Sequence, residues 1–192
     1  MKEEKTVFYP YSSWLKQRYG EKVYKLPVNL PVSCPNRCDG HGGCTFCSEK
    51  GTGFESVWQP ASVTEQMQHA RDVVAKRYKA RKFIAYFQNY TNTFMAMELF
   101  KAYLEEAAAF PDVVEISVST RPDCIRTDYL ACLAELQERT HVGINIELGL
   151  QTANYHTLDR VHRGHGLAEY IDAVLAIKRY PFTVCTHLIA NL

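Results

Sequence analysis

Short apolar segments alternate with longer amphipathic ones from about residue 25 to the end of the chain. Five short segments are rich in aromatic and β-branched residues, which predicts strands; they span residues 25–33, 82–87, 113–119, 142–150 and 182–189. Four segments between them carry apolar residues three or four positions apart, which predicts helices; they span residues 62–78, 95–110, 128–139 and 168–180. This alternation is typical of right-handed βαβ units around a parallel sheet. The sequence therefore predicts an α/β fold whose sheet is either open and doubly wound or curved into part or all of a (β/α) barrel.

Capping and helix-breaking residues mark the ends of these helices. Ser62, with Glu65 three residues later, predicts a capping box at the first helix. Thr127 is expected to be the N-cap of the third helix. Pro111 and Pro181 follow the second and fourth helices, where the chain cannot continue as a regular helix.

Polar residues follow the carboxyl ends of the predicted strands, where α/β folds bind their ligands. Gln88 and Asn89 follow the second strand, Arg121 follows the third and Gln151 follows the fourth. His187 lies near the end of the fifth strand. Because parallel strands end at one edge of the sheet, we expect these side chains to lie close together.

Composition and charge exclude several classes of protein. The chain has 192 residues, 46% of them hydrophobic and 22% charged, which is typical of one globular domain and not of a disordered chain. The formal net charge of +1 excludes bulk electrostatics as the main route to nucleic acid. No apolar run approaches the ~18–20 residues of a membrane span, and the N-terminus lacks a secretory h-region. A cytoplasmic location is therefore expected, with residues 1–24 as an N-terminal arm and residues 25–192 as the core.

The cysteines are unevenly distributed. Four of the seven fall within fourteen residues, namely Cys34, Cys38, Cys44 and Cys47. In a reducing compartment, clustered cysteines favour a metal or cluster site over disulfides. Three thiolates on a [4Fe–4S] cluster would leave one iron open, whereas all four would suit a structural zinc ion. The remaining cysteines lie in apolar surroundings and are expected to be small core residues; they are Cys124, Cys132 and Cys185.

The cysteine loop and several later segments carry a family resemblance. The loop CPNRCDGHGGCTFC, with an aromatic residue before its last cysteine, resembles the cluster loop of radical S-adenosylmethionine (SAM) enzymes. Nine residues separate its first ligand cysteine from the second, as in the Elongator catalytic subunit and a small bacterial relative of it. The resemblance spans essentially the whole chain, through the segments YSSWLKQRYG, GGCTFCSEKGTGFE, YFQNYTNT, STRPD, IELGLQT, HRGH and THLIANL. It implies a partial (β/α) barrel of the radical SAM type, here incomplete at the C-terminus because family members continue past the fifth strand.

This resemblance also implies an activity and its cofactors. A [4Fe–4S] cluster would be held by Cys34, Cys44 and Cys47, with Cys38 as an additional cysteine, and its open iron would bind SAM. One electron, from a donor such as flavodoxin or ferredoxin, would cleave SAM. The resulting 5′-deoxyadenosyl radical would abstract hydrogen from a tRNA base, with a wobble uridine as the expected one. The competing hypothesis is a non-catalytic zinc or iron–sulfur module that uses the same loop.

Four expected SAM contacts follow from the resemblance. Phe46 would pack beside the cluster and adenine, and Gln88 with Asn89 would meet the amino group of SAM. Arg121 would hold the carboxylate of SAM in a bidentate contact. For Phe46 the alternative is core packing, for the amides local capping, and for Arg121 a salt bridge with Asp123 or Glu147.

The fourth and fifth strands supply further candidates. Glu147 lies within an apolar strand, so it needs a partner or a ligand once buried, and we expect it to contact SAM or its ribose. Gln151 is a second candidate for that contact. His187 is either a cofactor contact or a satisfied core histidine. The basic loop Arg163-Gly164-His165 is either a solvated helix start or a contact to substrate or SAM.

Overall fold

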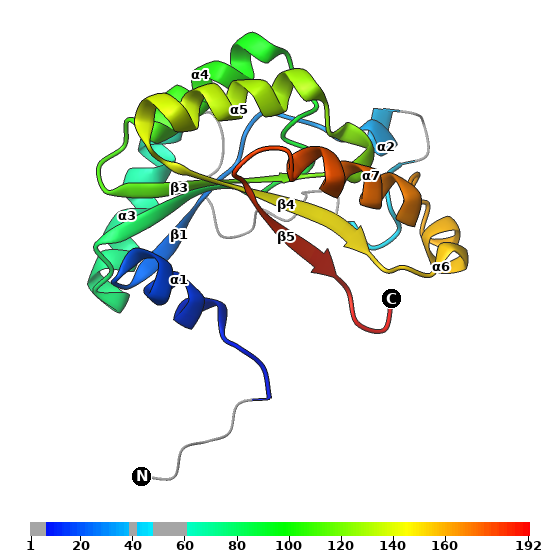
Figure 1. Ribbon diagram of the computed structural model, residues 1–192, viewed down its shortest axis with the longest axis horizontal. Coiled ribbons are helices and arrows are strands. Elements are labelled where there is room, and N and C mark those ends of the chain that lie inside the picture. The colour runs from blue at the N-terminus through cyan, green and yellow to red at the C-terminus, as the bar shows by residue number, and fades with distance from the viewer. Residues whose placement is uncertain (1–6, 39–41, 48–60) are drawn as a thin grey trace.

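Five parallel strands form one sheet in the computed structural model, which describes residues 7–38, 42–47 and 61–192 (Figure 1). The strands are β1 (Val23–Val28), β2 (Lys82–Phe87), β3 (Val113–Thr120), β4 (Gly143–Gln151) and β5 (Thr183–Leu188). The predicted α/β fold with five parallel strands is therefore confirmed. The first strand ends five residues earlier than predicted, because the backbone N–H groups of Asn29 and Leu30 donate to the side chains of Gln66 and Asn89 instead of to a strand.

The strand order distinguishes between the two predicted architectures. The order along the sheet is β1-β2-β3-β4-β5, so it never reverses. A doubly wound sheet reverses its order at a switch point, whereas sequential order is that of a (β/α) barrel. The sheet is not closed, because β1 and β5 each pair with one strand in the described part of the chain. The fold is a partial barrel.

Four helices cover the outer face of this sheet. They are α3 (Val63–Tyr78), α4 (Met97–Ala108), α5 (Thr127–Thr140) and α7 (Leu167–Ile177). Their apolar residues, among them Met67, Phe100 and Leu133, pack against alternate strand residues such as Phe87 and Ile146 in one continuous core. The other strand residues point to the inner face, which carries polar side chains such as Ser117, Ser119 and Glu147.

The capping predictions had mixed outcomes. The capping box is confirmed, since Glu65 N–H donates to Ser62 Oγ at 3.1 Å and Ser62 N–H donates to the Glu65 carboxylate at 2.8 Å. The Thr127 prediction is wrong: Thr127 is the first residue of α5, and the cap position is held by Arg126, which makes no capping hydrogen bond. The fourth helix was predicted to end at residue 180, but α7 ends three residues earlier, at Ile177. Beyond it the backbone forms turns in which each N–H donates to the carbonyl three residues before it.

Several short helices were not predicted. They are α1 (Tyr11–Tyr19), α2 (Pro35–Cys38), α6 (Tyr155–Arg160) and the 3₁₀ turn η1 (Pro122–Cys124). In α1 only Leu15 is buried, so the sequence of this helix lacks the apolar stripe from which a helix is predicted. Leu15 packs against Val23 and Ile84 on the inner face, so α1 lies across the sheet from α4 and α5 (Figure 1). No helix in the described residues has the length and apolar character needed to cross a bilayer.

Candidate functional site

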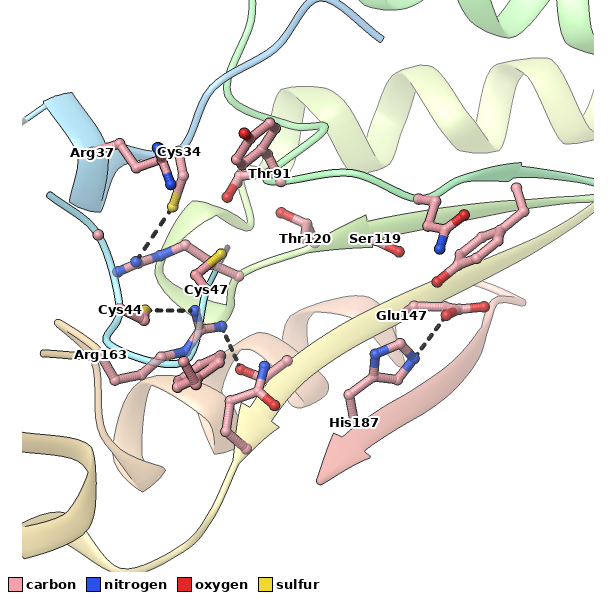
Figure 2. Close-up of a pocket in the computed structure, with 18 residues that line it drawn as sticks. Cys34, Arg37, Cys44, Cys47, Thr91, Ser119, Thr120, Glu147, Arg163 and His187 are labelled. Atoms are coloured by element: carbon pink, nitrogen blue, oxygen red, sulfur yellow. Dashed lines mark hydrogen bonds and ion pairs between the residues drawn. The ribbon is translucent and has the colours of Figure 1, made fainter. Parts of the chain in front are cut away.

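A cavity of about 340 Å³ lies on the inner face, at the carboxyl ends of the strands (Figure 2). It brings together residues from the cysteine loop, from β2, β3 and β4, and from β5. Nine of the ten side chains predicted from the sequence line it; they are Cys34, Cys44, Phe46, Cys47, Gln88, Arg121, Glu147, Gln151 and His187. Sequence positions more than 150 residues apart therefore meet around one space.

Three of the four clustered cysteines lie at one end of this cavity. Cys34 and Cys44 are buried and Cys47 is half-buried, and all three have free thiols (Figure 2). Cys38 is exposed at the end of α2, outside the cavity lining, with its thiol 3.9 Å from Ser33 Oγ. The fold thus separates Cys38 from the other three.

The cysteine loop is held by the loop that follows α6. Asn36 Nδ2 donates to Cys44 Sγ at 3.3 Å and to the backbone oxygens of His162 and Arg163. Gly164 makes this contact close: its φ is +75°, and a Cβ there would lie 2.6 Å from Asn36 Oδ1. The segment HRGH therefore supports the cysteine loop and is not a solvated helix start.

Two buried arginines reach the cysteine sulfurs. Arg121 Nη1 lies 3.6 Å from Cys34 Sγ, and Arg163 Nη1 lies 3.6 Å from Cys44 Sγ. Burial lowers the pKa of Arg121, but the hydrogen bonds and charge of Asp123 outweigh it and raise the pKa above its ordinary value. Arg121 binds Asp123 through Nε (2.9 Å) and Nη2 (2.7 Å), so the edge expected to grip a SAM carboxylate already holds a carboxylate of the protein.

The opposite end of the cavity is formed by a buried carboxylate. Glu147 is 1% exposed, pairs with Lys25, accepts from Ser117 Oγ at 2.7 Å and lies 2.7 Å from His187 Nε2. Burial raises its pKa, but the hydrogen bonds of His187 and Lys25 and the charge of Lys25 outweigh burial and hold the pKa at about 2. The partner that the sequence required for Glu147 is supplied by the protein itself.

The remaining predicted residues divide between cavity and scaffold. Gln151 lines the cavity at the end of β4 in a left-handed conformation (φ +73°), where the pairing with β5 shifts register. Phe46 and Gln88 also face the cavity. Asn89 does not, because its amide exchanges two hydrogen bonds with the backbone of Leu30, at 3.1 and 3.0 Å. Asn89 therefore caps the local backbone, which was the alternative to a cofactor contact.

Other lining residues were missed by the sequence reasoning. They are Arg37, Tyr86, Thr91 and Ser119. Tyr86 and Ser119 are the inner-face residues near the ends of β2 and β3, so strand alternation had the information to find them. Thr91 Oγ1 is buried without a hydrogen-bond partner in the described chain, which is expected of a group that meets a ligand.

The three cavity thiols can be compared with the ligand geometry of a zinc ion and of a [4Fe–4S] cluster. A zinc ion requires its ligands to converge at about 2.0–2.3 Å from one point. Within residues 7–38, 42–47 and 61–192, no three Cys, His, Asp or Glu side chains are placed for that. In a [4Fe–4S] cluster each thiolate binds a different iron, so three cysteines spread around one end of a cavity fit it.

The ion pair of Glu147 and His187 predicts a pH dependence of stability. Side-chain hydrogen bonds with Cys185 and Glu147 raise the pKa of His187 from 6.5 to about 9. Because the pKa of His187 is higher in the folded state, the protonated side chain stabilises the fold fully at pH values below the unfolded-state pKa. This stabilisation is lost as the pH rises through about 9. Urea unfolding at about pH 6 and pH 10 should therefore show His187→Gln clearly less stable than the parent at pH 6, with the gap narrowing at pH 10. A gap independent of pH would contradict this assignment.

Comparisons with known proteins agree with this geometry. Residues 29–192 match the sequence profile of the Radical SAM superfamily. The uncharacterized protein YtqA of Bacillus subtilis (strain 168) is 38% identical over 181 residues, covering 93% of this chain and 55% of YtqA. Protein YhcC of Escherichia coli (strain K12) is 38% identical over 180 residues, covering 93% and 57%. The chain thus spans just over half the length of these curated relatives.

Solved structures show the same fold at low sequence identity. The cobalamin-dependent S-adenosylmethionine radical enzyme OxsB, with aqua-cobalamin bound, superimposes with a TM-score of 0.52 and 15% identity. The match covers 85% of this chain and 23% of that one, and it concerns the fold alone.

Proposed function

Since this chain belongs to the radical SAM superfamily, we propose that it forms the part of an enzyme that binds a [4Fe–4S] cluster and SAM and cleaves SAM reductively. The observation that carries the proposal is the separation of the cysteines: Cys34, Cys44 and Cys47 share one cavity, and Cys38 lies outside it. Three ligands leave one iron for SAM, and the cavity extends from the thiols toward Glu147. When bound, the cluster supplies the electron that breaks the C–S bond of SAM to give a 5′-deoxyadenosyl radical.

The chain's own residues would bind and orient SAM between the two ends of the cavity. Phe46 packs against the adenine, and the amides of Gln88 and Gln151 bind polar groups of the cofactor. Arg121 faces the carboxylate of SAM with its own charge already balanced by Asp123, which binds its bidentate edge. Glu147 and His187 close the far end as a fixed ion pair.

Reductive SAM cleavage tests this proposal. Protein purified without oxygen should contain about four irons per chain. With dithionite and SAM it should release 5′-deoxyadenosine, and without the reductant it should not. A colourless protein with one zinc per chain and no 5′-deoxyadenosine would favour the competing structural module.

The electron donor and the substrate are proposals from the sequence resemblance. A reduced flavodoxin or ferredoxin supplies the electron, and a tRNA base, a wobble uridine in particular, supplies the hydrogen atom. Comparing modified nucleosides in tRNA from strains with and without the gene tests the substrate. Identical nucleoside profiles would contradict a role in tRNA modification without affecting the SAM chemistry.

A further inference from the structure

Two buried guanidinium groups donate to two of the three cavity sulfurs. Resting on the proposed function, we infer that Arg121 and Arg163 are positioning residues that hold the Cys34 and Cys44 sulfurs and raise the reduction potential of a cluster bound there. Neither residue replaces a ligand. Each acts on the cluster through the sulfur to which it donates.

Arg163 has a fixed orientation. Its side chain is 6% exposed, Nη2 donates to the backbone oxygen of Gly149 at 2.7 Å, and Nη1 donates to Cys44 Sγ at 3.6 Å. A Cβ at Gly149 would lie 2.8 Å from Nη2, so a side chain at this position would displace the guanidinium. One contact thus orients the guanidinium, and the other aims it at the sulfur (Figure 2).

The charge of Arg163 has no carboxylate partner in the described chain. The ion pairs among residues 7–38, 42–47 and 61–192 do not include it, and its Nε is buried without a hydrogen-bond partner. A buried charge is costly without a counter-charge. A cluster with three thiolates carries net negative charge and would supply that counter-charge beside Cys44.

Arg121, unlike Arg163, has a carboxylate partner for its charge. Asp123 binds its Nε and Nη2 and neutralises its charge, while Nη1 lies 3.6 Å from Cys34 Sγ. Its contribution is therefore mainly the N–H to sulfur hydrogen bond. Arg163 adds an uncompensated charge to the same kind of bond, so the effect of Arg163 should be the larger.

Both interactions favour the reduced state. Reduction by one electron from a flavodoxin- or ferredoxin-type donor adds one negative charge to the cluster and breaks no bond to the protein. Positive charge and hydrogen bonds at the ligand sulfurs stabilise that added charge, which raises the potential. The effect is strong because the guanidinium groups are buried, where charges are poorly screened.

A redox titration followed by electron paramagnetic resonance tests the inference. In iron-loaded Arg163→Gln, the equilibrium constant for one-electron reduction should fall about tenfold, equivalent to a midpoint about 59 mV lower. Arg121→Gln should shift in the same direction by less. Arg126→Gln is the matched control, because Arg126 is exposed, pairs with Asp128 and lies outside the cavity lining, and it should leave the midpoint unchanged.

Two results separate this inference from the proposed function. If Arg163→Gln binds four irons at the parent's midpoint, the inference is overturned while the proposed function stands. If the parent itself binds no cluster, the proposed function has failed first. If Arg163→Gln loses its iron, the titration is done on Arg163→Lys instead, because lysine keeps the positive charge but lacks the forked N–H donors of arginine. Its midpoint should lie below the parent's, and a midpoint at or above the parent's would overturn the inference.

Discussion

Cys34→Ala, Cys44→Ala and Cys47→Ala will each lose most of the bound iron, whereas Cys38→Ala will retain about four irons per chain. The reason is geometric: the first three thiols face one cavity, and the thiol of Cys38 is exposed and directed elsewhere. Release of 5′-deoxyadenosine from SAM should follow the iron, falling to background in the three variants. Iron analysis and product quantification on anaerobically prepared protein measure both effects.

Cys38→Ala serves as the matched control within this series. It lies in the same loop, so general damage to the loop would reduce its iron as well. The opposite ranking, with iron lost in Cys38→Ala and kept in Cys34→Ala, would contradict the ligand assignment. Cys132→Ala provides a second control, because Cys132 is a buried residue of α5 that does not line the cavity.

Lys25→Met will destabilise the fold by about 3 kcal/mol, toward the lower end of the ~3–5 kcal/mol range for breaking a buried ion pair. Glu147 is almost fully buried and ionised at neutral pH, since its pKa is held at about 2. Without Lys25 this charge keeps His187, Ser117 and Tyr86 as hydrogen-bonding partners. The free energy of unfolding in urea measures the loss.

A double variant separates charge from packing. In Lys25→Met with Glu147→Leu no unpaired carboxylate remains, so most of the stability should return, as found when buried pairs become apolar. Lys22→Met is the control, because Lys22 is exposed and contacts the backbone oxygen of Tyr78 and the rings of Tyr24 and Tyr78, but no carboxylate in the described residues. This change should alter stability by less than ~0.5 kcal/mol. If the double variant is as unstable as Lys25→Met, the loss does not come from the unpaired charge.

The fold was accessible from the sequence because its signals are local. Hydrophobic periodicity located the strands, and the pair Ser62 and Glu65 located the start of α3. The rule that ligands bind at the carboxyl ends of parallel strands then grouped Gln88, Arg121 and Gln151 before their contacts were known. The order of the strands required the structure, since each crossover alone permits an open sheet or a barrel.

The contacts that complete the site are non-local and carried no sequence signal. Lys25 and Glu147 are 122 positions apart, and Arg163 lies 119 positions from Cys44. Nothing in the residues themselves distinguishes Arg163 from a solvated arginine. For Asn89 the sequence predicted a cofactor contact that the structure does not have. An amide at a strand end can bind a ligand, but here both of its polar atoms are hydrogen-bonded to the backbone of Leu30.

Mössbauer spectroscopy of the protein reconstituted with ⁵⁷Fe tests the central claim most directly. Three cysteine ligands and one open iron predict a [4Fe–4S] spectrum in which one iron of the four changes when SAM is added, while the other three do not. A spectrum in which SAM alters no iron, or a protein that takes up one zinc instead of iron, would contradict the account.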